Sequence, residues 1–265
     1  MMKRHMRFLP IMASALGLAL VWAFGCSSPT KDVFAPDEKT YQVAGALIKE
    51  PNSNIASALM QVFKNGDTAE TMTILVGDDT LLYNGPTFDQ GVYGRVLGPA
   101  DSLLLGSAPV YLADSTVFAD TLFAVVPGKP VITDISPQLK GTSDPVRVTW
   151  NAAVNAEGYI VAAVKQDSVF DGIGWTQFVD QALTLVTIND SAFTRFNLQG
   201  GEPNPGLYYI FVYAYTGAPD SALSALRLPV PLPAQLDDNL DGGELAGRVG
   251  TVVVSNYGVV EVLAN

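Results

Sequence analysis

The sequence predicts an all-β protein with two tandem β-sandwich modules, preceded by an export signal and a short tether. From residue 41 onward, short runs of β-branched, aromatic and other apolar residues are broken by Gly, Pro, Asn and Asp, at spacings of about 8–12 residues that are typical of sandwiches. Apart from an ambiguous stretch at 55–63, the runs lack a helical period. A Pro-Gly-Lys-Pro sequence at 127–130 interrupts the pattern and marks the boundary between the modules.

Residues 1–25 predict a signal peptide. Residues 1–7 carry three fixed positive charges, and residues 8–24 are mainly apolar and uncharged, which is the pattern of a secretory signal. Residues 23–26 (Ala-Phe-Gly-Cys) resemble the lipobox of bacterial lipoproteins, in which the Cys is acylated with lipid and becomes the new N-terminus. A plain signal or a retained membrane helix is the alternative, since the apolar stretch has about the minimum length that spans a bilayer.

The resemblance implies a lipid anchor at Cys26, and therefore a membrane as a partner. Ser27 follows the Cys where an Asp would resemble an inner-membrane retention signal, so the outer membrane is the expected location if the organism has one. Residues 26–40 contain Pro, Ser, Thr and acidic residues without apolar periodicity, and they are expected to form a flexible tether.

Composition excludes several classes of function. Three of the 15 basic residues precede Cys26, so the rest of the chain carries 12 basic against 26 acidic residues and is expected to repel nucleic acid. The single His is residue 5 and the single Cys is residue 26. A mature chain that begins at Cys26 therefore has neither Ser-His-Asp nor Cys-His catalysis, nor a zinc site that needs these residues. We expect no catalytic residues and no cofactor, although a hydrolase based on two carboxylates stays open.

The first predicted module covers residues 41–128. Its expected strands include residues 71–76, 81–83, 91–96, 110–112 and 121–126. Asn65-Gly66 follows a further β-rich run and predicts a tight turn, because both residues tolerate positive φ.

The second predicted module covers residues 129–265. Residues 146–150 alternate, with Val146, Val148 and Trp150 on one face. A Gly-Tyr pair opens the next strand at 158, and a Tyr-rich strand follows at 205–215. This order of signals, over roughly residues 130–216, resembles a fibronectin type III domain.

The resemblance implies a buried Trp150 and a tyrosine corner at Tyr208, whose hydroxyl is expected to bond backbone near the turn at 196–198. The sequence departs from the family pattern in a long stretch between residues 164 and 188, and in a long connection to a last strand at 251–254 or 257–262. The first module more loosely resembles an Ig-like domain.

A stripe of aromatic residues is the strongest candidate ligand surface. If Tyr208 faces the core, strand alternation turns Tyr209, Phe211, Tyr213 and Tyr215 toward the opposite face. Such a stripe could bind a carbohydrate or a protein partner. The acidic segment around Trp175 is a second candidate. Because monomers rarely expose large apolar patches, we predict that residues 217–248, or the first module, bury at least two of the four stripe residues.

Residues 237–242 match the start of a calcium loop. Asp237, Asn239 and Asp241 take positions whose oxygens bind the ion, but the twelfth position holds Arg248 instead of a Glu. An acidic, solvated turn is the alternative, and we expect no metal.

Taken together, these patterns predict an exported, lipid-anchored, non-enzymatic protein for binding or adhesion, with a protein or carbohydrate partner. A structural spacer in an envelope complex is the alternative, and the carboxylate hydrolase is the third possibility.

Overall fold

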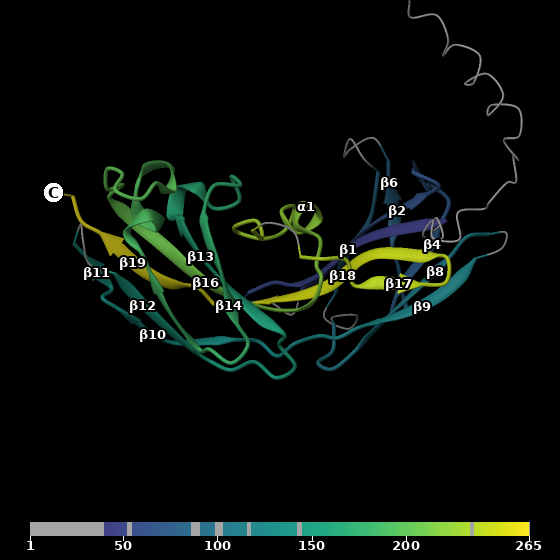
Figure 1. Cartoon of the computed structure of the whole chain (residues 1–265), viewed down its shortest axis with the longest axis horizontal. Coiled ribbons are helices and arrows are strands. Elements are labelled where there is room, and N and C mark those ends of the chain that lie inside the picture. Colours follow the sequence, from purple (N-terminus) through teal and green to yellow (C-terminus); the bar gives the residue numbers. More distant parts are fainter. Residues whose placement is uncertain are drawn as a thin grey trace, which may run out of the picture. The chain divides into compact units, whose positions relative to one another are not determined.

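The computed structural model describes residues 40–51, 55–85, 91–98, 103–115, 118–141, 145–233 and 236–264. Residues 39–265 form one compact unit. The predicted signal peptide, Cys26 and nearly all of the tether lie outside the described residues. Strands dominate the described part of the chain, and its helices are short (Figure 1), so the predicted all-β class is confirmed. None of the helices in these ranges is long and apolar enough to cross a membrane.

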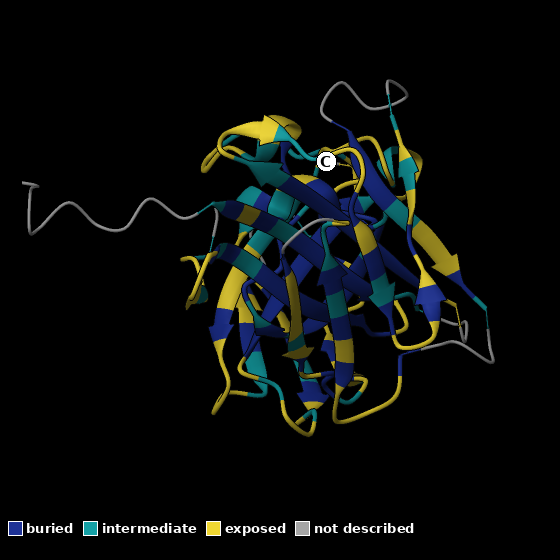
Figure 2. Cartoon of the chain, turned by 90° about the vertical axis from the view of Figure 1, so that its right-hand side faces the viewer, coloured by how far each residue is buried: buried dark blue, intermediate teal, exposed yellow. Residues whose placement is uncertain are grey.

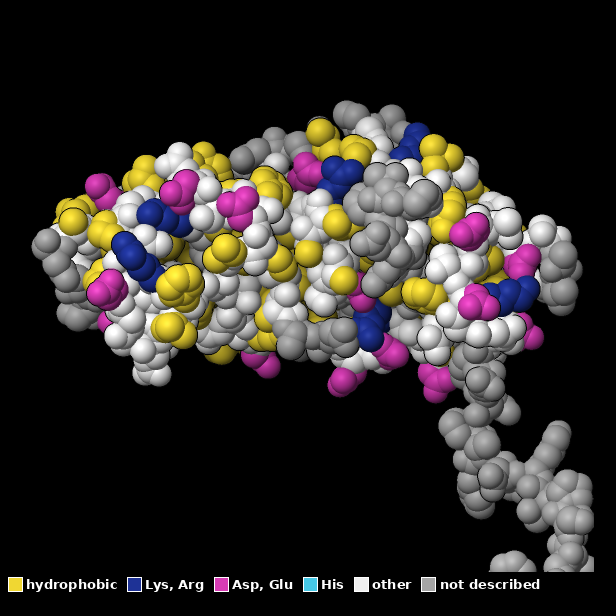
Figure 3. All heavy atoms as spheres, turned by 90° about the horizontal axis from the view of Figure 1, so that it is seen from above, with side chains coloured by type: hydrophobic (Ala, Val, Ile, Leu, Met, Phe, Trp, Pro, Cys, Tyr) yellow, Lys and Arg dark blue, Asp and Glu magenta, His cyan; other side chains and the backbone are white. Residues whose placement is uncertain are grey.

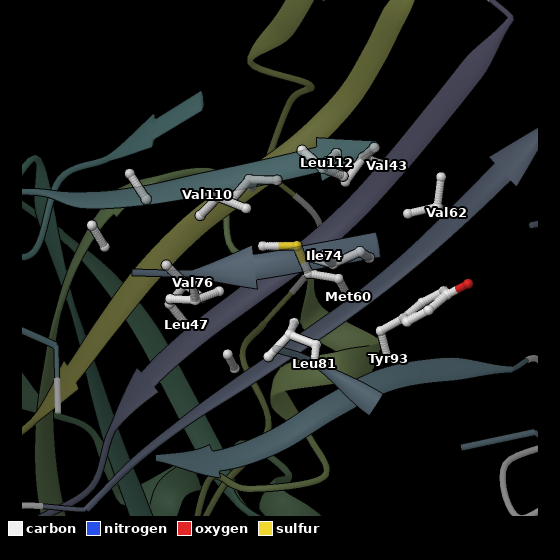
Figure 4. Close-up of a cluster of buried hydrophobic side chains, with 14 of the residues drawn as sticks. Val43, Leu47, Met60, Val62, Ile74, Val76, Leu81, Tyr93, Val110 and Leu112 are labelled. Carbon is white, nitrogen blue, oxygen red and sulfur yellow. The ribbon is translucent and has the colours of Figure 1, made fainter. Parts of the chain in front are cut away.

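The first module is a sandwich of two sheets. The order β5-β4-β8-β9 forms one sheet, and β1, β2 and β7 belong to the other. Figure 4 shows side chains from both sheets, including Leu47, Met60, Ile74 and Val110, meeting in a buried layer. The stretch with the ambiguous period is a strand, β2. The strands are β1 (Tyr41–Lys49), β2 (Ala56–Lys64), β3 (Asp67–Thr68), β4 (Thr73–Val76), β5 (Asp79–Thr80), β6 (Leu82–Asn84), β7 (Val92–Leu97), β8 (Ala108–Ala113) and β9 (Ala119–Ala124).

The second module is also a sandwich. A three-stranded sheet, β10-β12-β15, packs its apolar side chains against those of β14, β13, β16 and β19. This arrangement agrees with the expected fibronectin type III-like fold. The elements up to the long β16 are β10 (Val131–Ser136), β11 (Leu139–Lys140), β12 (Val146–Asn151), β13 (Gly158–Lys165), η1 (Gln166–Ser168), β14 (Trp175–Asp180), β15 (Leu185–Ile188), η2 (Asp190–Phe193), η3 (Arg195–Asn197) and β16 (Gly206–Gly217).

The burial of Trp150 in the second module confirms which face of its strand was predicted to point into the core. Trp150 is 3% exposed, and its ring meets the edge of Tyr159 at a centroid distance of 5.4 Å. The long stretch between residues 164 and 188, which departs from the family pattern, contains two strands, β14 and β15. β14 pairs with β13 over residues 175–180.

One C-terminal strand serves both modules. The last elements are α1 (Ser221–Ser224), β17 (Leu240–Gly242), β18 (Leu245–Val254) and β19 (Gly258–Val262). β18 pairs in parallel with β1 over the whole length of β1, and its last residues pair antiparallel with β16. β19 continues along β16 after a one-residue shift. At this shift, the Ser255 hydroxyl accepts a hydrogen bond from the Val212 amide at 2.9 Å.

Both positions predicted for the last strand are therefore paired, and the two modules share a 12-stranded sheet. Leu245, Val249 and Val253 of β18 pack in the core of the first module. The boundary at residue 128 stays a prediction, but the first module takes part of its core from the end of the chain.

A third apolar cluster lies on the outer face of the shared sheet. We call residues 218–233 the cover segment, because their side chains pack onto this face. Figure 1 shows α1, which belongs to this segment, beside β1. The buried residues of the strands are dark blue in Figure 2. Gly250 permits the close approach, because a Cβ there would lie 2.3 Å from the nitrogen of Pro219. The buried members include Ile48, Leu59, Val164, Phe211, Tyr213, Leu223, Leu228, Val230, Leu232 and Val252.

Candidate functional site

The predicted aromatic stripe is covered at its centre. Phe211 is 3% exposed and Tyr213 is fully buried, and both pack in the cluster with leucines of the cover segment. The Tyr213 hydroxyl donates to the carbonyl of Val230 and accepts from its amide, both at 3.2 Å. Burial raises the pKa of this hydroxyl well above its usual range. The prediction that at least two stripe residues are buried is confirmed, and the stripe does not form a continuous open surface.

The remaining stripe residues and Trp175 are half-buried. The Tyr209 ring lies 4.4 Å from that of Tyr257, while Tyr215 meets the edge of Phe178 at 6.1 Å. Trp175 begins β14 and packs at the rim of the second module's core. The buried pair separates Tyr209 from Tyr215, and Trp175 packs against the inner core instead of the outer cluster, so the three side chains do not form a single platform.

The tyrosine corner exists, but its partner differs from the predicted one. Tyr208 is 3% exposed, and its hydroxyl donates to the carbonyl of Asn204 at 2.9 Å, not to backbone near residues 196–198. That turn carries two residues with positive φ, Phe196 and Asn197, and the Phe196 side chain is 86% exposed. The chain then returns, and the Asn204 amide bonds the Phe193 carbonyl, which brings Asn204 to the corner. Burial, with a smaller contribution from Asp167, raises the pKa of Tyr208 to about 12.

Two of the three calcium candidates, Asn239 and Asp241, are engaged in other contacts. Asn239 donates to the carbonyl of Val249 at 2.9 Å and accepts from its amide at 3.0 Å. Asp241 lies in β17, which pairs with β18 as a hairpin. Asp237 adjoins Asp238, and the Arg248 Nε lies 3.1 Å from an oxygen of Asp238. Across the described ranges, His, Cys, Asp and Glu side chains do not form a group of three that could hold a metal.

A polar cavity lies on the outer face of the first module, beside the cover segment, which contributes Asp220 and Ala222 to its lining. Its volume is about 360 Å³, which is near the lower end of the roughly 300–1,000 Å³ of ligand pockets. The register of the strands explains its shape. On the central strand β1, Ala44 stands between Gln61 of β2 and Arg248 of β18. The small Ala44 therefore leaves a hollow between two longer polar side chains.

The next row of the same face completes the cavity. Gln42 of β1 pairs with Phe63 on one side and with Ala246 on the other. Gln42 is exposed, Gln61 is buried, and Phe63 is half-buried. The floor thus consists of alanines, and glutamines and one aromatic ring stand around it.

Charged residues close the side of the cavity that faces the cover segment. The Arg248 Nε lies 3.1 Å from Asp238 and 3.9 Å from Asp220. Asp220 also accepts a hydrogen bond from the Leu223 amide at 2.9 Å, which anchors α1 beside the site. The Nη1 atom of Arg248 is buried without a hydrogen-bond partner. Two carboxylates thus share one guanidinium that still has an unsatisfied donor, and such donors cost free energy unless something pairs with them.

In the sequence, Arg248 was assigned only as the residue that takes the place of a calcium-binding Glu, and Gln42 and Gln61 were not predicted as site residues. The alternation of apolar and polar residues along these strands could have indicated them. In residues 41–47 and 58–62 the apolar residues face inward, so the intervening glutamines face outward beside alanines. The pairing between β1 and β18, some two hundred residues apart, has no signature in the sequence.

Charge is dispersed on the face seen in Figure 3. Among the side chains that this view describes, basic residues form small separate groups with acidic residues near them. This distribution differs from the stripe of Lys and Arg that nucleic-acid binding proteins present.

Comparison with known proteins yields distant structural matches. No family model matches the chain, and no curated protein matches it. The chain is similar to the FN1-FN3 domains of chicken CNTN1, with a TM-score of 0.28 and 13% identity, covering 65% of this chain and 57% of that one. It is also similar to IG1+IG2 of DIP-gamma, with a TM-score of 0.21 and 9% identity, covering 82% of this chain and 98% of that one. The chain therefore spans little more than half of the CNTN1 fragment, and the fold assignment rests on the strand pairing described above.

Proposed function

We propose that this protein is an exported, lipid-anchored protein of the cell envelope that acts as a non-enzymatic binding module for a protein or carbohydrate ligand. The observation that carries the binding role is the polar cavity between Gln61 and Arg248, which lies outside both sandwich cores. The anchor is supported by the apolar segment that ends in Gly25-Cys26. The outer membrane is the proposed location where the organism has one.

The anchor is tested by replacing the lipidated residue. Cys26→Ser is expected to release the protein from the membrane fraction or to stall its processing, because stable anchoring needs two or more acyl chains. Ser28→Ala is the matched control, and it leaves the Cys in place. An intact mass that corresponds to an unmodified Cys26 contradicts the anchor.

The binding role is tested with the full chain in detergent. Binding to arrayed glycans and to purified envelope proteins is expected to be saturable for at least one ligand, and a heat-denatured sample is the control. If the anchored protein binds none of these ligands, the binding role is wrong.

A structural spacer is the second candidate, and two observations favour it. The shared strand β18 ties the modules together by backbone pairing on both of its edges, and the centre of the aromatic stripe is covered. A spacer predicts a lipid anchor without saturable ligand binding, so the two experiments above distinguish the candidates.

A hydrolase has less support. Asp220 and Asp238 are the carboxylates beside the cavity, but both contact the same guanidinium, and Asp220 also caps α1. Neither carboxylate is therefore free to act as the acid or the nucleophile of glycoside hydrolysis. Prolonged incubation with glycans is expected to release no reducing ends.

A further inference from the structure

We propose that the polar cavity binds an uncharged, hydroxyl-rich ligand, namely one or two sugar units of a glycan. This inference rests on the binding role proposed above and adds the site and the ligand class. Three features of the described residues support it: the shape of the cavity, its hydrogen-bonding groups and its charge.

The shape suits a flat ring. The floor is made of Ala44, Ala246 and the backbone of Gly247, which have little or no side chain. Phe63 stands at one side as a half-buried aromatic ring. A sugar ring has one apolar C–H face that packs on such a surface, while its hydroxyls point toward the walls.

The walls carry groups that both donate and accept hydrogen bonds. The amides of Gln42 and Gln61 each have an acceptor oxygen and two donor hydrogens. The carboxylate of Asp238 accepts, and the guanidinium of Arg248 donates. A hydroxyl both donates and accepts, so a ligand with several hydroxyls can satisfy this mixed set. An apolar ligand would remove the exposed Gln42 amide from water without replacing its hydrogen bonds, which costs free energy.

The charges favour a neutral ligand. Asp220 and Asp238 outnumber Arg248, and the chain from Cys26 onward is strongly acidic, so an anion is repelled. A cation would compete with Arg248 for the same carboxylates and leave its partly buried guanidinium without its ion pairs. A neutral ligand keeps both ion pairs of Arg248.

The test measures binding of a panel of uncharged methyl glycosides and oligosaccharides to the full chain by isothermal titration calorimetry. The detergent must be zwitterionic, because glucoside and maltoside detergents carry sugar headgroups that would occupy the site. Ala246→Phe places a ring in the cavity, and Gln42→Ala removes an exposed wall group. Gln177→Ala, an exposed Gln on strand β14 of the second module, is the matched control.

The expected result is binding that Ala246→Phe weakens by about tenfold or more and that Gln42→Ala weakens several-fold, as for the loss of one hydrogen bond. Gln177→Ala leaves the affinity unchanged. Each variant's melting temperature is recorded, and Gln42→Ala keeps the test valid if Ala246→Phe fails to fold. Tighter binding of oligosaccharides than of methyl glycosides indicates a polymeric glycan, and equal affinities indicate a free sugar.

Two results overturn the inference but leave the binding role intact. In the first, saccharides bind equally well to the Gln42→Ala and Ala246→Phe variants, which places their site elsewhere. In the second, no saccharide binds at millimolar concentration while an envelope protein does, which makes the ligand class wrong. If neither kind of ligand binds, the proposed function fails together with this inference.

Discussion

The outer face of the shared sheet has two regions that differ in side-chain size. Toward the second module, the strands present Phe211, Tyr213 and Ile160, and the cover segment buries them. Toward the first module, the same face presents mainly small or polar residues such as Ala44 and Gln42, with the Phe63 ring at one side, and a cavity remains. One continuous backbone thus supports a closed apolar region beside an open polar one.

The difference shows that the side chains on a face determine whether it needs a cover. Large aromatic groups are stabilised when they leave water, by about 25 cal/mol for each Å² of apolar surface. Alanine and glutamine gain little from the same burial. The cover segment, in which Asp220 accepts a hydrogen bond from the Leu223 amide, packs on the part of the face that carries the buried aromatic and aliphatic side chains.

The largest predicted loss of stability is for a substitution in the inner core of the second module. It serves as a reference for the substitutions in the two outer regions. Trp150→Ala is expected to lower the free energy of unfolding by about 3–5 kcal/mol. The lower part of this range is expected, because the buried Nε1 of Trp150 has no acceptor whose loss would add to the cost. Chemical denaturation measures the effect. Trp175→Ala, at the half-buried rim of the same core, is the control and should cost less. Equal costs would contradict the assigned core.

The next effect tests the closed region. Leu228→Ala is expected to cost about 2–3 kcal/mol, because Leu228 is 1% exposed and packs in the outer cluster. Leu226→Ala removes the same group two residues earlier, where the side chain is 41% exposed, and it should stay within about 0.5 kcal/mol of the wild type. Thermal denaturation of both variants measures the contrast. Similar losses would mean that the cover segment does not seal this region.

A third prediction concerns alkaline pH. Tyr208 has its pKa raised to about 12, and burial also raises the pKa of Tyr213, whereas the unfolded chain ionises its tyrosines near pH 10. The folded state therefore holds its phenolic protons above pH 10, when the unfolded state loses them. Stability present below pH 10 should fall between pH 10 and 12, by about 1.4 kcal/mol per pH unit for each such tyrosine.

Denaturation at several pH values checks this slope. Tyr213→Phe should reduce the loss with pH, even though it lowers stability at neutral pH by removing two hydrogen bonds. Leu226→Ala, which removes an exposed apolar side chain and no phenol, is the control and should keep the wild-type slope. A flat stability curve up to pH 12 would contradict the raised pKa values of both Tyr208 and Tyr213.

The sequence predicted those features that local alternation determines. The orientation of Trp150 followed from the period-2 pattern of its strand, and the burial of Tyr208 was implied by the resemblance to fibronectin type III domains. The burial of at least two stripe residues followed from the rarity of open apolar patches on monomers, and the two buried residues are Phe211 and Tyr213. Strand β14 was not predicted, because Gly172 and Gly174 precede it and its acidic neighbours are typical of a loop.

The cavity could not be predicted, because it depends on pairing between strands that are distant in sequence. Ala44 lies between Gln61 and Arg248 only because β18 returns to β1 in parallel after the whole second module. No short-range pattern encodes that return. The hydrogen-bond acceptor of Tyr208 was predicted wrongly for a related reason. The chain turns away at 196–202, so the carbonyl that the Tyr208 hydroxyl reaches is that of Asn204.

The smallest predicted effect concerns the loop at the border of the open region. Millimolar calcium, or its removal by a chelator, should shift the melting temperature little. Asn239 is bonded on both sides to the Val249 backbone, and Asp241 is part of a hairpin strand. A calcium site here would have to break this hairpin and would also bring a dication next to Arg248. Because an ion that binds only the folded state stabilises it by mass action, a rise of several degrees with calcium, absent with magnesium at equal ionic strength, would contradict this interpretation. It would also change the chemistry of the cavity, since Asp238 would then serve a cation rather than a neutral ligand.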